Sequence, residues 1–119
     1  MHPHLTTLLE IQDLRGQLRE LTTDPAAAQV QSEHFNVDLG AAAQALEAKI
    51  EELVATLDAR VRRRYERTLA SLGRVVVPVI DGVCYGCFVS IATATAGEVG
   101  PNDVLRTCES CGRFIYVLP

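Results

Sequence analysis

Tryptophan is absent from this chain of 119 residues, and other aromatic side chains are few, with three Tyr and three Phe. So little aromatic bulk is insufficient for a large globular core. Leu, Ala and Glu dominate the first 70 residues, as is typical of a long helical segment. The composition therefore favours a helical element joined to a small, separately stabilised one.

No hydrophobic run approaches the length of a membrane span, and the opening Met1-His2-Pro3-His4 lacks the basic-then-apolar pattern of a signal peptide. We therefore expect a cytoplasmic protein with no membrane partner, in a compartment where thiols stay reduced and available to a metal.

The sequence also lacks the residue sets that enzymes use. It contains no Ser/His/Asp set, no carboxylate pair placed for acid–base work and no phosphate-binding glycine loop. We therefore expect a protein that is not an enzyme and has no small-molecule substrate.

Only four cysteines occur, and all of them fall in two C-x2-C pairs separated by 20 residues. Such pairs form a cage of four thiolates around one tetrahedral zinc ion, so one Zn²⁺ per chain is predicted. Two disulfides, unrelated buried thiols and a rubredoxin-like iron site are the alternatives. A closed four-sulfur site has no open position for water or substrate. The predicted ligands are Cys84, Cys87, Cys108 and Cys111.

Charge is distributed unevenly along the chain, whose net charge is −4. Residues 1–59 hold three basic side chains against ten acidic ones, whereas residues 60–119 hold eight arginines against five acids. An acidic segment is thus joined to a mildly basic one, which favours oriented binding to a charged partner.

Two stretches carry apolar residues at the alternating three- and four-residue spacing of a coiled-coil seam. We expect them to form an antiparallel helical hairpin, with a parallel dimer as the rival. Pro3 in the first turn, or a Thr7–Glu10 capping box, would begin the first helix. The seam positions are Ile11, Leu14, Leu18 and Leu21, then Leu39, Ala43, Leu46, Ile50, Leu53 and Leu57.

The predicted tip of the hairpin runs from residue 22 to 37, with Asp24-Pro25 as a helix stop. Acidic side chains here either keep the turn solvated or bind a protein partner. The candidate tip residues are Asp24, Glu33 and Asp38.

Beyond Leu57 the apolar spacing changes to four residues, so the stripe turns around the helix. We expect the helix to continue here as an arginine-rich neck that ends at Gly73. Its arginines either grip phosphates or form a solvated face. Those predicted to share one face are Arg60, Arg63, Arg64 and Arg67, with Arg62 opposite.

Residues 74–119 are predicted to form a zinc ribbon, and residues 1–73 the helical domain, which gives an α+β fold. Val75–Ile80 is predicted as an edge strand because Pro78 cannot donate a backbone hydrogen bond. Asp81-Gly82 is predicted to form a turn into the first C-x2-C pair. Residues 88–91 are predicted as a second strand, and residues 113–118 as the closing strand. So small a unit depends on its metal for folding.

Four aromatic residues of this region either fill its core or stack on nucleic-acid bases. They are Tyr85, Phe88, Phe114 and Tyr116.

From Tyr65 onward the chain resembles a bacterial family with an N-terminal coiled-coil hairpin and a C-terminal zinc ribbon of the four-cysteine type. The matching stretches are Arg64–Arg67, Val77–Val79, Asp81–Cys84 and Cys111–Tyr116. This chain is a short-hairpin variant. The resemblance implies zinc at the four cysteines and a nucleic-acid-binding or protein-adaptor role, and some members regulate flagella or secretion through RNA or transcription factors.

Three functions remain open at this point. The first is a non-enzymatic adaptor or regulator, whose coiled coil binds protein and whose basic neck and ribbon contact RNA, DNA, RNA polymerase or a sigma factor. The second is a transcription factor of the type that inserts an acidic hairpin tip into the polymerase secondary channel, although the D-x-x-D-x-A motif of that group is absent. The third is a zinc–thiolate redox switch.

Overall fold

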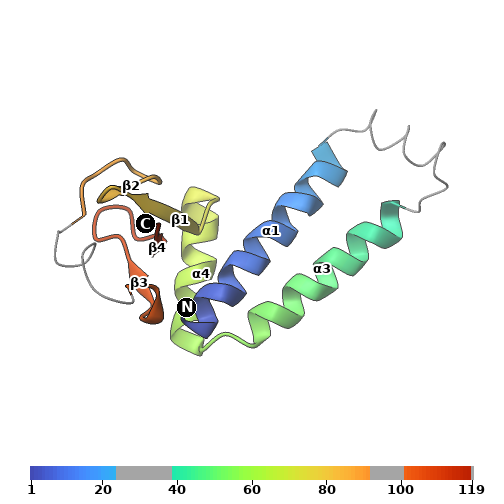
Figure 1. The fold of residues 1–119 in the computed structure, drawn as a ribbon. Helices are drawn as coiled ribbons and strands as arrows, with labels where there is room; N and C mark the ends of the chain where they lie inside the picture. The colour runs from blue at the N-terminus through green and yellow to red at the C-terminus, as the bar shows by residue number, and fades with distance from the viewer. Residues whose placement is uncertain (24–38, 92–100, 119) are drawn as a thin grey trace. The chain divides into compact units, whose positions relative to one another are not determined.

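The structure is a computed structural model that describes residues 1–23, 39–91 and 101–118. Within these residues it contains three α-helices, a short 3-10 helix and four strands, an α+β composition (Figure 1). By its internal contacts the chain divides into two units: Met1–Leu9 with Leu57–Pro119, and Glu10–Thr56. The helix that carries the arginines, residues 59–72, therefore belongs to the same unit as the strands. Independent folding of residues 74–119 stays a prediction.

Helices α1 (Pro3–Thr23) and α3 (Leu39–Ala55) carry the two predicted seams. Pro3 is the first helical residue, as one of the two predicted starts required, and its carbonyl oxygen accepts a hydrogen bond from the Thr7 hydroxyl. Seam residues from Ile11 onward whose burial is described are buried or half-buried, with Ile11 and Ile50 the most enclosed in Glu10–Thr56. Each helix therefore has one apolar, shielded face.

The helix predicted to continue past Leu57 is interrupted, and this expectation is wrong. Helix α3 ends at Ala55, and α4 (Ala59–Leu72) begins after Asp58, whose carboxylate accepts a hydrogen bond from the Arg60 backbone N–H at 2.8 Å. Asp58 is thus an N-cap, because its side chain satisfies one of the free amides of the new helix. The predicted end at Gly73 is confirmed, with φ of 77° and an N–H bonded to the Leu69 carbonyl oxygen.

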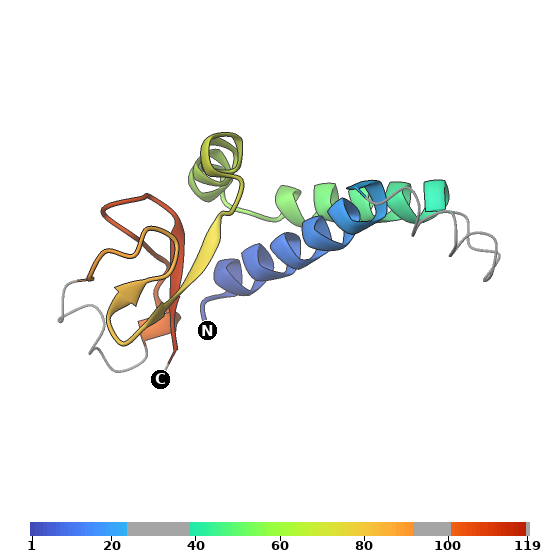
Figure 2. The ribbon, with the colours of Figure 1, turned by 90° about the horizontal axis from the view of Figure 1, so that it is seen from above.

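Four short strands form one sheet in the order β2-β1-β4-β3. They span β1 (Val76–Ile80), β2 (Val83–Cys84), β3 (Arg106–Thr107) and β4 (Phe114–Val117). β1 pairs with β2 in antiparallel and with β4 in parallel register, and Figure 2 shows β1 and β4 side by side. The β1–β2 turn is the predicted Asp81-Gly82, with φ of 52° and 75°. Residues 88–91 contribute only a bridge from Ser90 to Val83.

Strand β1 lies inside the sheet, so the prediction of an edge strand is wrong. Pro78 is tolerated there because the pairing of β1 with β2 includes Val79 and Ile80 but not Pro78. The Pro78 carbonyl oxygen accepts a hydrogen bond from Tyr85 N–H at 3.0 Å. The nitrogen and carbonyl of a strand residue face the same side, so the missing N–H of Pro78 faces the turn after β2 and costs no bond to β4.

Alternate residues of the two central strands make the core around the cysteines. Val77, Val79 and Ile115 pack with Cys84 and Cys108 in one cluster. Val76 and Phe114 are equally buried on the opposite face of the sheet. In the same unit, the buried side chains outside the sheet and the cysteines include Leu5 and Leu8 of α1, Tyr65 and Thr68 of α4, and Leu57 in the connection before α4. The cysteines are therefore part of the hydrophobic core.

Among the helices in the described ranges, none is both long and apolar enough to cross a bilayer.

Candidate metal centre

The two C-x2-C pairs fold into matching turns. In the first, Phe88 N–H donates to the Cys84 carbonyl oxygen and Cys84 N–H to that of Val89. In the second, Gly112 N–H donates to the Cys108 carbonyl oxygen and Cys108 N–H to that of Arg113. The backbone is thus the same at equivalent positions, and each turn presents two sulfurs to the other. We call these turns knuckle 1 (residues 84–89) and knuckle 2 (residues 108–113).

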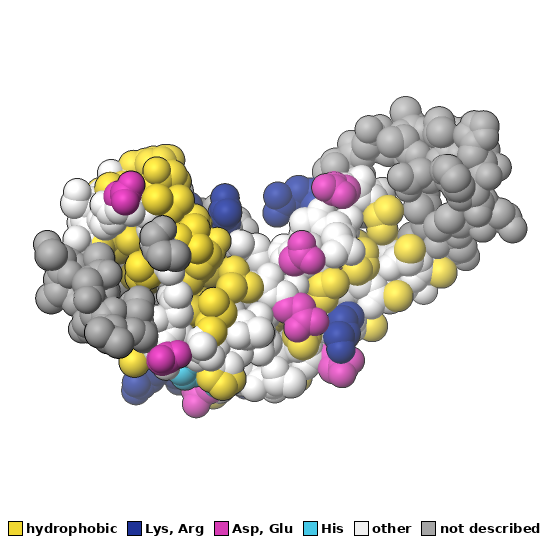
Figure 3. All heavy atoms as spheres, viewed as in Figure 1, with side chains coloured by type: hydrophobic (Ala, Val, Ile, Leu, Met, Phe, Trp, Pro, Cys, Tyr) yellow, Lys and Arg dark blue, Asp and Glu magenta, His cyan; other side chains and the backbone are white. Residues whose placement is uncertain are grey.

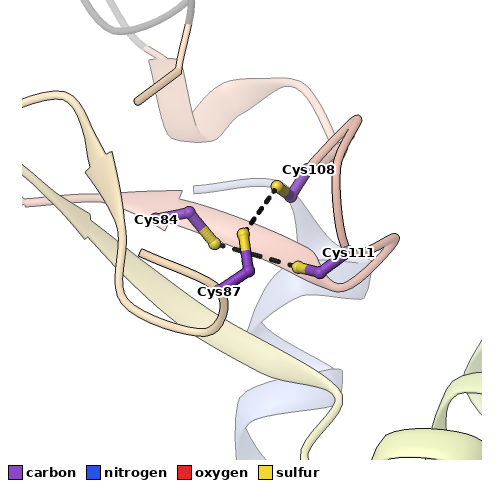
Figure 4. Close-up of side chains that lie close together, drawn as sticks. All are labelled: Cys84, Cys87, Cys108 and Cys111. Carbon is purple, nitrogen blue, oxygen red and sulfur yellow. Dashed lines mark hydrogen bonds between the residues drawn. The ribbon is translucent and has the colours of Figure 1, made fainter. Parts of the chain in front are cut away.

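The four sulfurs converge between the knuckles (Figure 4). Cys84 Sγ lies 3.9 Å from Cys111 Sγ, Cys87 Sγ lies 3.7 Å from Cys108 Sγ, and all four lie within 4.8 Å of one another. A tetrahedral ion with metal–sulfur bonds of about 2.3 Å separates its sulfurs by about 3.8 Å. All four cysteines are free thiols rather than disulfides. The four predicted ligands therefore fit one metal ion.

Backbone amides support the sulfurs. The N–H groups of Gly86 and Cys87 hydrogen-bond to the Cys84 sulfur, and the N–H of Val89 to that of Cys87. In knuckle 2 the amides of Ser110 and Cys111 do the same for Cys108. Such bonds offset part of the negative charge that four thiolates concentrate around one ion.

Burial and backbone hydrogen bonds shift the thiol pKa values in opposite directions. Burial raises the pKa of the Cys84 thiol, and it raises that of Cys108 to about 12. The Val89 N–H instead lowers the pKa of the half-buried Cys87 thiol to about 7. Buried thiolates are unfavourable without a counter-charge. A cation at the centre of the four sulfurs supplies it, so the chemistry of the donor set also fits a metal.

Two arginines contact the knuckles, and sequence reasoning gave neither contact. Arg64 Nη1 on α4 donates to the Gly112 carbonyl oxygen of knuckle 2 at 3.4 Å. Arg113 packs against Gly86 of knuckle 1, where a Cβ atom would come within 2.9 Å of Arg113 Cδ. Arg113 Nε also donates to the Arg74 carbonyl oxygen at 3.0 Å. Both guanidinium groups thus lie against the turns that hold the sulfurs.

The other predicted phosphate-binding residues lie on the outer side of α4. Arg60, Arg63 and Arg67 are exposed, whereas Arg64 is half-buried. Within the described ranges, Arg60, Arg63 and Arg67 have no carboxylate within ion-pair distance. Their guanidinium groups are therefore available to an outside anion.

The four aromatics predicted for the C-terminal region divide into two groups. The Phe114 side chain is buried on the face of the sheet opposite the cysteine cluster, and Tyr116 is half-buried. Tyr85 and Phe88, both on knuckle 1, are exposed, and their ring centroids lie 5.7 Å apart. The core interpretation thus holds for Phe114 and not for the pair on the knuckle.

Asn102 is a structural residue that sequence reasoning missed. Its side-chain amide donates to the Val117 carbonyl oxygen at 2.9 Å and accepts from Val117 N–H at 2.7 Å. It lies in the 3-10 helix η1 (Pro101–Asp103) and extends the hydrogen bonding of β4 beyond β3. The turn signal at Pro101-Asn102 predicts a bend but not this contact. The tip candidates Asp24, Glu33 and Asp38 lie outside the described residues.

Comparison of the whole chain with solved structures found a similar protein. The chain is similar to CT398 from Chlamydia trachomatis, with a TM-score of 0.55 and 26% sequence identity. The match covers 87% of this chain but only 44% of CT398, so the chain spans less than half the length of that protein. No protein-family model and no curated protein matches the sequence.

Proposed function

We propose that this protein is a non-enzymatic, zinc-binding adaptor or regulator of the cytoplasm. In this proposal the chain resembles the zinc-ribbon family named above, α1 and α3 pair as a short coiled-coil hairpin for a protein partner, and the knuckles form a zinc ribbon. The arginines of α4 bind the phosphates of a nucleic acid. The observation that carries the proposal is the convergence of four cysteine sulfurs within 4.8 Å.

Zinc is the ion favoured by four thiolates in tetrahedral arrangement, with iron as the alternative that uses the same ligands. When bound, it supplies a structural crosslink between the knuckles, because four protein ligands leave no position for a reacting molecule. A reducing compartment such as the cytoplasm keeps such thiols free for metal. These points support a structural role for the ion and a binding role for the protein.

Support for nucleic-acid binding comes from α4. Arg60, Arg63 and Arg67 are exposed along one side of the helix and lack described acidic partners. Exposed guanidinium groups bind phosphates and release condensed counterions, so such binding weakens steeply as salt rises.

The nucleic-acid role is tested by neutralising the three arginines with Arg60→Gln, Arg63→Gln and Arg67→Gln. Fluorescence anisotropy with a labelled single-stranded RNA should show weaker binding and a salt dependence whose log–log slope is shallower by about 2. A matched control applies the same total charge change at exposed positions of α3, with Lys49→Gln, Gln44→Glu and Ala45→Glu. Equal loss in both variants, or salt-independent binding by the unmodified protein, would contradict the role.

A further inference from the structure

Phe88 occupies a backbone position that suits glycine. Its φ is 60°, and Gly112 has a φ of 77° at the equivalent point of knuckle 2. The equivalence is set by hydrogen bonding, since each residue donates its N–H to the carbonyl oxygen of the first cysteine of its own knuckle. Left-handed backbone is unfavourable for a residue with a bulky side chain and free of penalty for glycine. Folding alone thus favours glycine at both positions.

The Phe88 ring contributes little to the core that could offset this strain. Its exposed fraction is 71%, the largest among the exposed large hydrophobic residues of the described chain. The neighbouring Tyr85 is 46% exposed, and so is Val89. Figure 3 shows hydrophobic side chains gathered over the β2 end of the sheet. A strained, exposed aromatic is a feature of binding sites more than of packing.

The geometry of the pair favours flat partners. The two ring planes are inclined at 49° with centroids 5.7 Å apart, so the rings meet at an angle instead of covering each other's faces. Each ring thus retains a face on which a planar group can stack.

The positive charge of Arg113 beside the Tyr85 and Phe88 rings favours a planar partner that is also negatively charged. Arg113 lies against Gly86, which follows Tyr85 directly in knuckle 1. Among the described residues, Arg113 has no carboxylate within ion-pair distance. Exposed aromatics beside an unneutralised guanidinium are the combination that binds unpaired bases and their phosphates.

We infer that Tyr85 and Phe88 form a stacking platform for the bases of a single-stranded nucleic acid, with Arg113 beside it to contact the backbone phosphates. The inference rests on the proposed nucleic-acid role and adds the class of nucleic acid and the residues that recognise it. Duplex is disfavoured, because its bases are stacked on one another and unavailable to the rings.

The test substitutes Phe88→Gly, which removes the ring and suits the left-handed backbone. Binding of a labelled single-stranded oligouridylate of about 12 nucleotides should weaken about tenfold or more. Metal content and the thermal unfolding midpoint should be unchanged or higher. Val104→Ala is the matched control, because Val104 is an exposed apolar side chain outside the knuckles. It should leave affinity unchanged.

Phe88→Trp gives a second readout. The chain has no other tryptophan, so emission reports this position alone. Binding should be retained, and the emission should be quenched by single-stranded oligonucleotide and not by a duplex of the same sequence.

The outcomes distinguish failure of the stacking platform from failure of the proposed nucleic-acid role. Unchanged affinity in Phe88→Gly overturns the platform and leaves the arginine role standing, as would result if the rings served a protein partner. A lower unfolding midpoint in Phe88→Gly also overturns it, because the ring would then be structural. If the unmodified protein binds neither single-stranded RNA nor DNA, both the platform and the proposed nucleic-acid role are wrong.

Discussion

Arg64 on α4 donates a hydrogen bond from Nη1 to the carbonyl oxygen of Gly112, at a distance of 3.4 Å and across 48 residues of sequence. The contact joins the helix predicted as an arginine-rich neck to the turn that holds Cys108 and Cys111. It also distinguishes Arg64 from Arg60, Arg63 and Arg67, which remain exposed. Phosphate binding by Arg64 stays a prediction, and its contact with knuckle 2 gives it a structural task as well.

Replacing Arg64 should therefore lower stability in a way that replacing a neighbouring arginine does not. Arg64→Gln should reduce the free energy of unfolding by about 1 kcal/mol, because it removes a charged donor from a half-buried carbonyl. Urea unfolding of the metal-bound protein measures the change. Arg63→Gln is the control and should stay within about 0.5 kcal/mol of the unmodified protein. Equal effects of the two substitutions would argue against the contact.

Glycine-to-alanine changes at two positions should have opposite signs. Gly86→Ala should destabilise by about 1–3 kcal/mol, because its Cβ would lie 2.9 Å from Arg113 Cδ and 3.1 Å from Cγ1 of the buried Val77. Gly16→Ala should stabilise by about 0.5–1 kcal/mol, since Gly16 is inside α1 and, apart from its own helix backbone and chain neighbours, no atom of the described residues lies within 4 Å of the added methyl. Thermal or urea unfolding compares the two, and a stabilising Gly86→Ala would show that knuckle 1 is less tightly packed than described.

The interruption between α3 and α4 depends on Asp58. Asp58→Ala should destabilise by about 1 kcal/mol, because the first turn of α4 loses its capping acceptor. Asp58→Asn keeps an oxygen acceptor and should be nearly neutral. Helical content by circular dichroism and the unfolding free energy are the measurements. An increase in helix for Asp58→Ala would mean that α3 and α4 prefer to join.

Metal binding should displace protons. At pH 7 the raised pKa values of Cys84 and Cys108 mean that both thiols are protonated without metal, and a metal ligand must be a thiolate. Calorimetric titration of zinc in two buffers of different ionisation enthalpy should therefore show release of about two or more protons per ion. Affinity should fall as pH falls, because protons compete for the same sulfurs. Zinc uptake without proton release would place the ion elsewhere.

Local signals in the sequence were sufficient for much of the candidate metal centre. The four candidate ligands follow from the C-x2-C spacing, because each pair needs only a tight turn to present two sulfurs. The Asp81-Gly82 turn and the helix end at Gly73 follow from left-handed backbone that glycine adopts without penalty.

Features that depend on distant parts of the chain could not be predicted in the same way. The central position of β1 depends on its parallel pairing with β4, and no short-range pattern near Pro78 encodes that partner. The contact of Arg64 with Gly112 likewise has no local signal. The break at Asp58 was detectable, since Asp is a strong N-cap residue and the apolar spacing changes beside it.

The most direct test of the account is the metal content of protein purified without oxygen, measured together with the amide spectrum of residues 74–118. We predict one zinc ion per chain bound by Cys84, Cys87, Cys108 and Cys111, and collapse of the dispersed ribbon resonances when a strong chelator removes it. Protein that contains no stoichiometric zinc or iron, yet keeps a well-dispersed spectrum for residues 74–118, would contradict the account.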